Sequence, residues 1–203
     1  MNNTGAFRLE KVAEADFPTQ FGQFRIYGFV GHYPNKTEES VVLRMGDPTS
    51  AEPPLVRIHS QCLTGDVFHS LRCDCRAQLE MALEMISAAG LGIIIYEHQE
   101  GRGIGLMNKL KAYQLQDAGA DTVEANHLLG FEADLRDYKL PTSILTALGV
   151  KRLKLLSNNP EKIDAITKAG IEVTERVPCL IEPQEHTGLY LRTKKEKMGH
   201  LLG

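Results

Sequence analysis

The chain of 203 residues contains 42% hydrophobic and 24% charged residues, a balance typical of one globular domain and unlike that of disordered proteins. Its 23 basic and 26 acidic residues give a net charge of −3, which excludes a global positive field for nucleic acid but not a local cationic site for a small polyanion. The chain starts without a basic and then apolar leader, and its longest apolar run is too short to cross a bilayer, so we expect a cytoplasmic protein without membrane association.

Residues 7–60 have the pattern of β-structure. Short aromatic and aliphatic runs alternate with glycine, and further strands are predicted at residues 41–43 and 55–58. Pro48, Pro53 and Pro54 mark the loop between these two strands. The pattern predicts a meander or a small barrel-like sheet.

From about residue 74, predicted helices and strands alternate. Apolar positions recur at helical spacing and glycines end the helices, which predicts helices at 74–89, 105–118, 141–148 and 160–169 and strands at 92–96, 153–156 and 171–173. The predicted fold class is therefore α+β or mixed α/β: an N-terminal, mainly β section is followed by alternating helices and strands around a mixed sheet. We expect a single domain over 1–203, with a lysine-rich, mobile tail at about 190–203.

Three cysteines lie close together in the sequence, at Cys62, Cys73 and Cys75. In a reducing compartment, metal binding or catalysis is a better expectation for them than disulfide formation. Three thiolates leave the fourth position of a tetrahedral zinc ion open, as in catalytic sites. The spacing equally allows a structural zinc closed by His59 or His69, or a group of buried thiols without a metal.

A glycine-rich turn at residues 99–105 connects a predicted strand to a predicted helix. Such a turn can expose backbone N–H groups to an anion. Its glycines do not have the spacing of a dinucleotide-binding motif or a P-loop, so phosphate binding and a plain tight turn both remain open. Glu100 and Arg102 favour a functional role, since one can pair with an amidine-like base edge and the other with phosphate.

Two further polar segments have a plain and a functional interpretation. Ser157 begins a Ser-Asn-Asn-Pro turn that favours ordinary helix capping, although Ser157 and Lys162 could donate to an anion. Asp134 and Arg136 belong to a run of charges that is typical of a solvated or salt-bridged surface. A partly desolvated Asp134 could instead act as a general base.

Together these motifs resemble GTP cyclohydrolase II, and the resemblance covers nearly the whole chain. The matching segments are residues 57–66, 71–75, 99–106, 121–127, 156–160 and 197–200. The resemblance implies the first enzyme of riboflavin biosynthesis, which hydrolyses GTP, opens its imidazole ring at C8 and releases formate and pyrophosphate to give 2,5-diamino-6-(5-phosphoribosylamino)pyrimidin-4-one. It also implies a homodimer, one Zn²⁺ per chain, and Mg²⁺ with the triphosphate of GTP.

The resemblance also assigns roles to individual residues. The zinc ligands would be Cys62, Cys73 and Cys75. The catalytic residues would be Tyr113 near the reacting base, Asp134 as proton acceptor and Arg136 as nucleophile toward the α-phosphate. A charged guanidinium is a poor nucleophile, so stabilisation of the departing pyrophosphate is the physically easier role for Arg136. The GTP-binding residues would be Arg57, Ile58, His59, Ser60, Gln61, Gln78, Glu100, Gly101, Arg102, Thr122, Ser157 and Lys162.

Three residues depart from the family pattern. Gln61 stands where the family usually has glutamate, and Ser157 where it usually has threonine. Arg76 replaces the usual glycine and would reshape the rim of the pocket if that position needed a positive φ or a close approach of the ligand. These departures leave two alternatives to a working enzyme: a paralogue that binds GTP but stops at a partial reaction, and a zinc-stabilised binding module without turnover.

Overall fold

The computed structural model describes residues 6–181, 199 and 201, so most of the predicted mobile tail lies outside the described residues. Within them, one seven-stranded mixed sheet has the order β1-β2-β3-β5-β4-β6-β7. Its strands are β1 (Arg8–Thr19), β2 (Gly22–His32), β3 (Thr37–Met45), β4 (Leu55–Ser60), β5 (Gly92–Glu97), β6 (Arg152–Leu156) and β7 (Glu172–Val177). The helices are α1 (Leu63–Asp66), α2 (Cys75–Ala89), the 3₁₀ turn η1 (Glu100–Gly103), α3 (Leu106–Asp117), α4 (Thr122–Leu128), α5 (Lys139–Ala147) and α6 (Pro160–Lys168). The predicted mixed α/β class is confirmed.

The N-terminal strands form the predicted meander but not a separate barrel-like sheet. Strands β1, β2 and β3 pair antiparallel, and β3 continues antiparallel onto β5. Strand β4 lies between β5 and β6 and runs parallel to both. The reason is visible in β4, where Leu55, Val56 and Ile58 are all buried, because a strand that is apolar on both faces belongs in the centre of a covered sheet.

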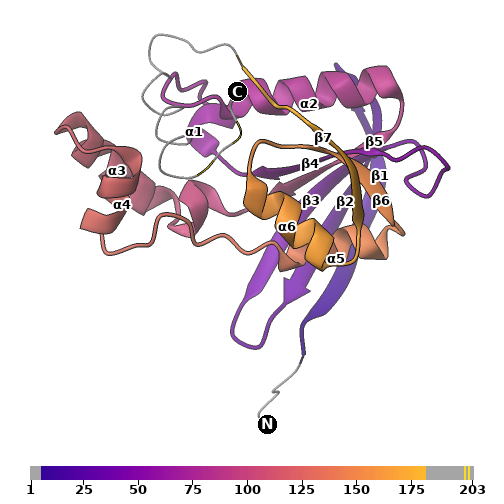
Figure 1. The fold of residues 1–203 in the computed structure, drawn as a ribbon, viewed down its shortest axis with the longest axis horizontal. Coiled ribbons are helices and arrows are strands. Elements are labelled where there is room, and N and C mark those ends of the chain that lie inside the picture. The colour runs from indigo at the N-terminus through magenta and orange to yellow at the C-terminus, as the bar shows by residue number, and fades with distance from the viewer. Residues whose placement is uncertain (1–5, 182–198, 200, 202–203) are drawn as a thin grey trace.

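Helices cover both faces of the sheet (Figure 1). On one face, Ile94 of β5 packs with Ala82 and Ile86 of α2. On the other, the neighbouring Ile93 joins a core that includes Ile144 of α5. This alternation along β5 places the strand in the middle layer of three.

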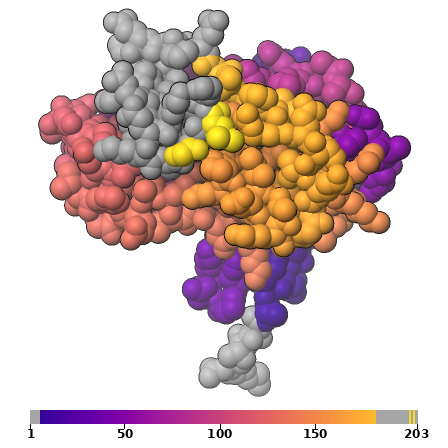
Figure 2. Space-filling model, viewed as in Figure 1, coloured from indigo at the N-terminus to yellow at the C-terminus, as the bar shows by residue number. Residues whose placement is uncertain are grey.

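The parallel strands β4, β5 and β6 end at the same edge of the sheet, and their continuations carry the predicted functional segments. Helices α3 and α4 extend beyond this edge (Figure 1). In the space-filling view, the α3–α4 segment lies at the left of the visible face and the α6–β7 segment lies to its right (Figure 2). The ends of the first strands project below them. Ligands of open α/β sheets bind in crevices beyond the carboxyl ends of the strands.

Helix α4 was not predicted, although its sequence carries a start signal. Asp121 accepts hydrogen bonds from the backbone N–H groups of Val123 and Glu124, and the Glu124 side chain accepts from the Asp121 N–H. This reciprocal capping box explains the acidic residues that otherwise look like a solvated charge run. No helix among the described residues is long and apolar enough to cross a membrane.

Candidate active site

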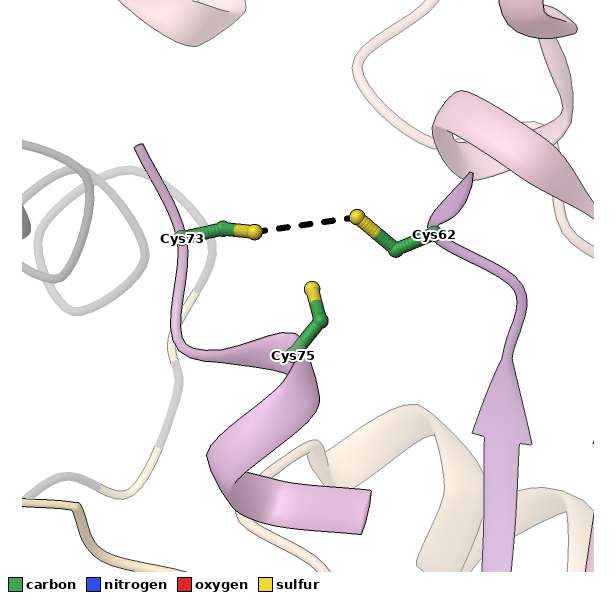
Figure 3. A group of neighbouring side chains, drawn as sticks. All are labelled: Cys62, Cys73 and Cys75. Atoms are coloured by element: carbon green, nitrogen blue, oxygen red, sulfur yellow. Dashed lines mark hydrogen bonds between the residues drawn. The ribbon is translucent and has the colours of Figure 1, made fainter. Parts of the chain in front are cut away.

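The three predicted cysteines meet at the carboxyl edge of the sheet. Cys62 follows β4, Cys73 lies in the next loop and Cys75 begins α2, and their side chains point toward one another (Figure 3). Their Sγ atoms all lie within 4.8 Å of one another, and those of Cys62 and Cys73 are 3.6 Å apart. Tetrahedral zinc with Zn–S bonds of ~2.3 Å places neighbouring sulfurs ~3.8 Å apart, whereas a disulfide bond measures ~2.05 Å. The spacing therefore fits a thiolate metal site.

The backbone beside the cysteines also fits a metal site. A Cβ atom on Gly65 would lie 2.8 Å from the Cys73 Sγ and 3.1 Å from the Cys62 Sγ. Any side chain at this position would push the thiols apart, so the absence of one preserves the space between them. Gly65 has no sequence pattern that predicts this role.

Neither histidine considered as a fourth ligand joins this cluster. Among the described residues, the cysteines form the only group of three or more potential metal-ligating side chains. The Nε2 atom of His59 lies instead 3.2 Å from both carboxylate oxygens of Asp66, and His69 is exposed. Within the described part of the chain, the cluster therefore offers three ligands, one fewer than a closed structural zinc site uses.

Asp66 connects the segment at residues 61–74, which carries Cys62 and Cys73 and is called the metal loop below, to the sheet. One of its oxygens accepts hydrogen bonds from the Cys62 N–H at 3.0 Å and from the Tyr96 hydroxyl at 2.8 Å. The same carboxylate contacts His59, whose ring stacks on that of Tyr96 with centroids 5.4 Å apart. Burial lowers the pKa of His59, and although Asp66 opposes this shift, the ring is neutral at physiological pH. These contacts fix the direction in which Cys62 leaves β4.

A cavity beside the cysteines concentrates positive charge in a chain that is negative overall. Its wall includes two acidic residues, Glu100 and Asp121, besides the thiols. Against them stand six basic residues: Arg57, Arg72, Arg102, Lys109, Arg136 and Lys162, although burial lowers the pKa of Lys162. Such a local excess of cations fits a small polyanion.

Most residues expected to bind substrate or act in catalysis line this cavity. They are Arg57, His59, Ser60, Gln61, Gln78, Glu100, Gly101, Arg102, Tyr113, Thr122, Arg136, Ser157 and Lys162. Ile58 is an exception, because its side chain lies in the core with 1% exposure. Its carbonyl oxygen accepts a hydrogen bond of 2.7 Å from the Lys162 Nζ, so only its backbone takes part in the site. Asp134 does not itself line the cavity and reaches it through Arg136.

Arg102 has both an unusual backbone and an unsatisfied side chain. Its φ of 61° follows a φ of 62° at Gly101, so an arginine occupies the left-handed region that usually favours glycine. Both terminal guanidinium nitrogens are buried without a hydrogen-bond partner among the described residues. A buried, unpaired guanidinium is costly, and an anionic ligand in the cavity would satisfy it.

Asp134 and Arg136 form an ion pair. The Arg136 Nε lies 2.9 Å from one Asp134 oxygen, a terminal nitrogen contacts the other, and the Arg136 N–H also donates to the carboxylate at 3.0 Å. Burial raises the pKa of Asp134, but the hydrogen bonds and charge of Arg136 outweigh it, and the pKa lies below its usual value. A further Arg136 nitrogen lies 3.3 Å from the Ser60 hydroxyl, which directs the guanidinium into the cavity.

The Ser-Asn-Asn-Pro turn both caps a helix and lines the cavity. The Asn159 side chain caps α6 by accepting from the Glu161 N–H at 2.9 Å, which confirms the predicted helix cap. Ser157 and Asn158 are nevertheless buried and line the cavity. Capping and ligand contact are therefore compatible at this helix start.

Arg76 does not reshape the pocket rim as expected. It lies in the first turn of α2 with helical geometry, and it does not line the cavity. Its guanidinium donates to the Asp66 carbonyl oxygen at 2.9 Å and pairs with Glu80 at 2.8 Å. The position requires no positive φ, and the side chain points along the helix surface toward the metal loop.

Glu97, at the end of β5, is a buried acid that no sequence motif indicated. Its side chain is almost fully buried, and its Oε2 atom has no hydrogen-bond partner among the described residues. Desolvation raises its pKa to about 8, although Lys162 and Arg136 oppose the shift. Between its ordinary pKa and this value, the folded protein holds a proton that the unfolded chain has released, so Glu97 lowers stability progressively as the pH rises.

We therefore expect Glu97→Gln to be stabilising at alkaline pH. The free energy of unfolding of the variant should exceed that of the wild type by an amount that grows from about pH 5 to about pH 8, reaching a few kcal/mol at most. Urea unfolding at several pH values measures the difference directly. A difference independent of pH would show that Glu97 is charged throughout this range.

Comparison with known proteins gives a consistent result. A family model described as GTP cyclohydrolase II matches residues 10–178. A riboflavin biosynthesis protein RibBA of Aquifex aeolicus is 54% identical over 194 residues, which cover 95% of this chain and 47% of that protein. A GTP cyclohydrolase-2 of Histophilus somni is 52% identical, covering 96% of this chain and 89% of the relative. One of Saccharophagus degradans is 53% identical, covering 96% of both chains. The chain thus spans about half of the RibBA protein and nearly all of the two GTP cyclohydrolases.

Proposed function

Because this chain belongs to the GTP cyclohydrolase II family, we propose that it hydrolyses GTP in the first step of riboflavin biosynthesis. The reaction opens the imidazole ring at C8 and releases formate and pyrophosphate, leaving 2,5-diamino-6-(5-phosphoribosylamino)pyrimidin-4-one. The observation that carries the proposal is the position of the three-cysteine cluster in the wall of a cavity lined by six basic side chains. Ring opening and pyrophosphate release need these two features in one site.

The cationic wall suits the triphosphate. Lys162 is fully buried, and its burial together with the charges of Arg136 and Arg57 lowers its pKa. An anion bound among these groups relieves their mutual repulsion and pairs the free nitrogens of Arg102. Mg²⁺ would bind mainly through the phosphates and water, so the uncharged Gln61 amide does not remove its principal ligands.

The cysteine cluster is the proposed zinc site. A zinc ion held there would supply Lewis acidity and lower the pKa of a coordinated water. Tyr113 lies on the same side of the cavity, and its hydroxyl is 3.0 Å from the Thr64 hydroxyl in the metal loop. That contact sets the ring near the cysteines, where the reacting end of the guanine would bind.

Asp134 and Arg136 have different roles in the proposed mechanism. With its lowered pKa, Asp134 is a carboxylate at neutral pH, and it holds the Arg136 guanidinium in place. We assign Arg136 to stabilising the charge that develops as pyrophosphate leaves, because a charged guanidinium is a poor nucleophile. Asp134 can accept a proton only when its bonds to Arg136 loosen during the reaction.

Quantifying all products together tests the proposal. Protein loaded with zinc and given GTP and Mg²⁺ is expected to release formate, pyrophosphate and the pyrimidine product in equal amounts. Pyrophosphate without formate would identify a paralogue arrested at a partial reaction. Bound GTP without any product would identify a binding module and overturn the assignment as an enzyme.

The homodimer implied by the family is part of the same proposal. Strand β1 forms one edge of the sheet, and its Val12 is 60% exposed to solvent. An apolar side chain is therefore available for a contact with a second copy of the chain. Light scattering on the purified protein measures the mass directly, and a monomeric mass at working concentration would contradict this part of the proposal.

A further inference from the structure

One cation lies against the cysteine cluster from the side of α3. The Lys109 Nζ is 3.1 Å from the Cys62 Sγ and 2.7 Å from the Glu100 Oε1. The Lys109 side chain is 13% exposed and that of Glu100 is 8% exposed. The ammonium is therefore held between a proposed metal ligand and a buried carboxylate, away from most of the solvent.

Glu100 is itself fixed, so it acts as an anchor for Lys109. Its Oε2 accepts a hydrogen bond of 2.7 Å from the Leu63 N–H, next to Cys62 in the metal loop. Its Oε1 accepts from the Gly101 N–H at 3.0 Å as well as from Lys109. The backbone N–H of Lys109 donates to the Gly105 carbonyl oxygen at 3.0 Å, which connects the start of α3 to the same glycine-rich turn.

We propose that Lys109 is a positioning residue that tunes the metal centre through Cys62, an inference that rests on the proposed zinc site. Three thiolates around Zn²⁺ carry a formal charge of −1, which weakens the metal as a Lewis acid. An ammonium that donates a hydrogen bond to one thiolate offsets this charge and withdraws electron density from the sulfur. The same bond holds Cys62 in the orientation that faces Cys73 and Cys75.

The buried ion pair makes this role more specific than general surface attraction. Exposed pairs contribute little because water and salt screen them, whereas a partly buried pair keeps its strength and its geometry. Lys109 also reaches the metal loop through Glu100, a residue expected to contact GTP. Its position thus connects the substrate side of the cavity to the sulfur of Cys62.

The test compares Lys109→Gln with Lys111→Gln, since Lys111 is an exposed residue of the same helix. We expect Lys109→Gln to weaken zinc binding about 10–100-fold, the range typical for loss of a group that supports a metal ligand. Competition with a chromophoric chelator measures this affinity. With Co²⁺ in place of zinc, the thiolate-to-metal charge-transfer band should move to lower energy, because the unassisted Cys62 thiolate is richer in electrons. Lys111→Gln should change neither quantity.

A second variant guards against a simple loss of folding. Lys109→Met keeps the length and apolar stem of the side chain, and it should show the same weaker binding and the same spectral shift. Wild-type affinity and spectrum in either folded Lys109 variant would overturn the inference while leaving the cyclohydrolase proposal intact. Failure of the wild-type protein to bind zinc or Co²⁺ at all would instead overturn the proposed metal site, and the role of Lys109 with it.

Discussion

Cys73→Ser is expected to lower formate release by roughly three orders of magnitude or more. The substitution leaves two thiolates, and a neutral hydroxyl is a poor ligand for zinc. A catalytic metal contributes several kcal/mol to the transition state, and each ~1.4 kcal/mol corresponds to a tenfold change in rate. GTP binding should be affected far less, because the cationic wall of the cavity remains. Metal content by emission spectrometry, formate release and GTP affinity separate these effects.

Cys179→Ser is the matched control for this experiment. Cys179 is also buried, at 1% exposure, but it packs with Met81 at 4.0 Å between sulfurs and lies outside the three-cysteine cluster. We expect the control to keep its zinc and its formate release and to lose only a little stability. If Cys73→Ser kept wild-type formate release, ring opening would not depend on the cysteine cluster, and the proposed role of the metal would be wrong.

The sequence predicted the elements of this fold better than their arrangement. The apolar spacing of α2 and the buried run of β5 identify both elements without any structural information. The sheet order was missed because β4 was assigned to an N-terminal meander, although its run of Leu55, Val56 and Ile58 is apolar on both faces. The predicted last strand at 171–173 is longer in the structure, where β7 extends to Val177. Strand β7 lies at the edge of the sheet, and its charged residues interrupt the apolar run that would predict a strand.

Part of the candidate site could likewise be predicted from the sequence, and part could not. The cysteines could be chosen from spacing, and the family resemblance selected side chains that do line one cavity. Gly65 and Lys109 could not be selected, because a small residue in a loop and a lysine in a helix have no local pattern that indicates their neighbours. Their roles depend on the packing of α1, α2 and α3 around the cysteines, which is a property of the tertiary structure.

Arg136→Gln is expected to lower pyrophosphate release about 10²–10³-fold, as is typical when one group that stabilises a developing negative charge is removed. Arg136→Lys keeps a positive charge at nearly the same place and should recover part of this loss. A covalent role for the guanidinium predicts a different result, in which lysine and glutamine are equally defective. Arg152→Gln, in an exposed residue of β6, is the control and should leave the rate unchanged.

The same variant has a pH signature that follows from its partner. In the wild type, Arg136 holds the pKa of Asp134 below its usual value against the opposing effect of burial. With Arg136 replaced by glutamine, burial remains and its largest opposing charge is gone, so the pKa of Asp134 rises. If catalysis requires the Asp134 carboxylate, the acid limb of the rate profile of Arg136→Gln must move to higher pH, because more of the residue is protonated at each acidic pH. An unmoved acid limb together with the slower rate would show that Asp134 serves only to hold Arg136, and that the proton acceptor is another group.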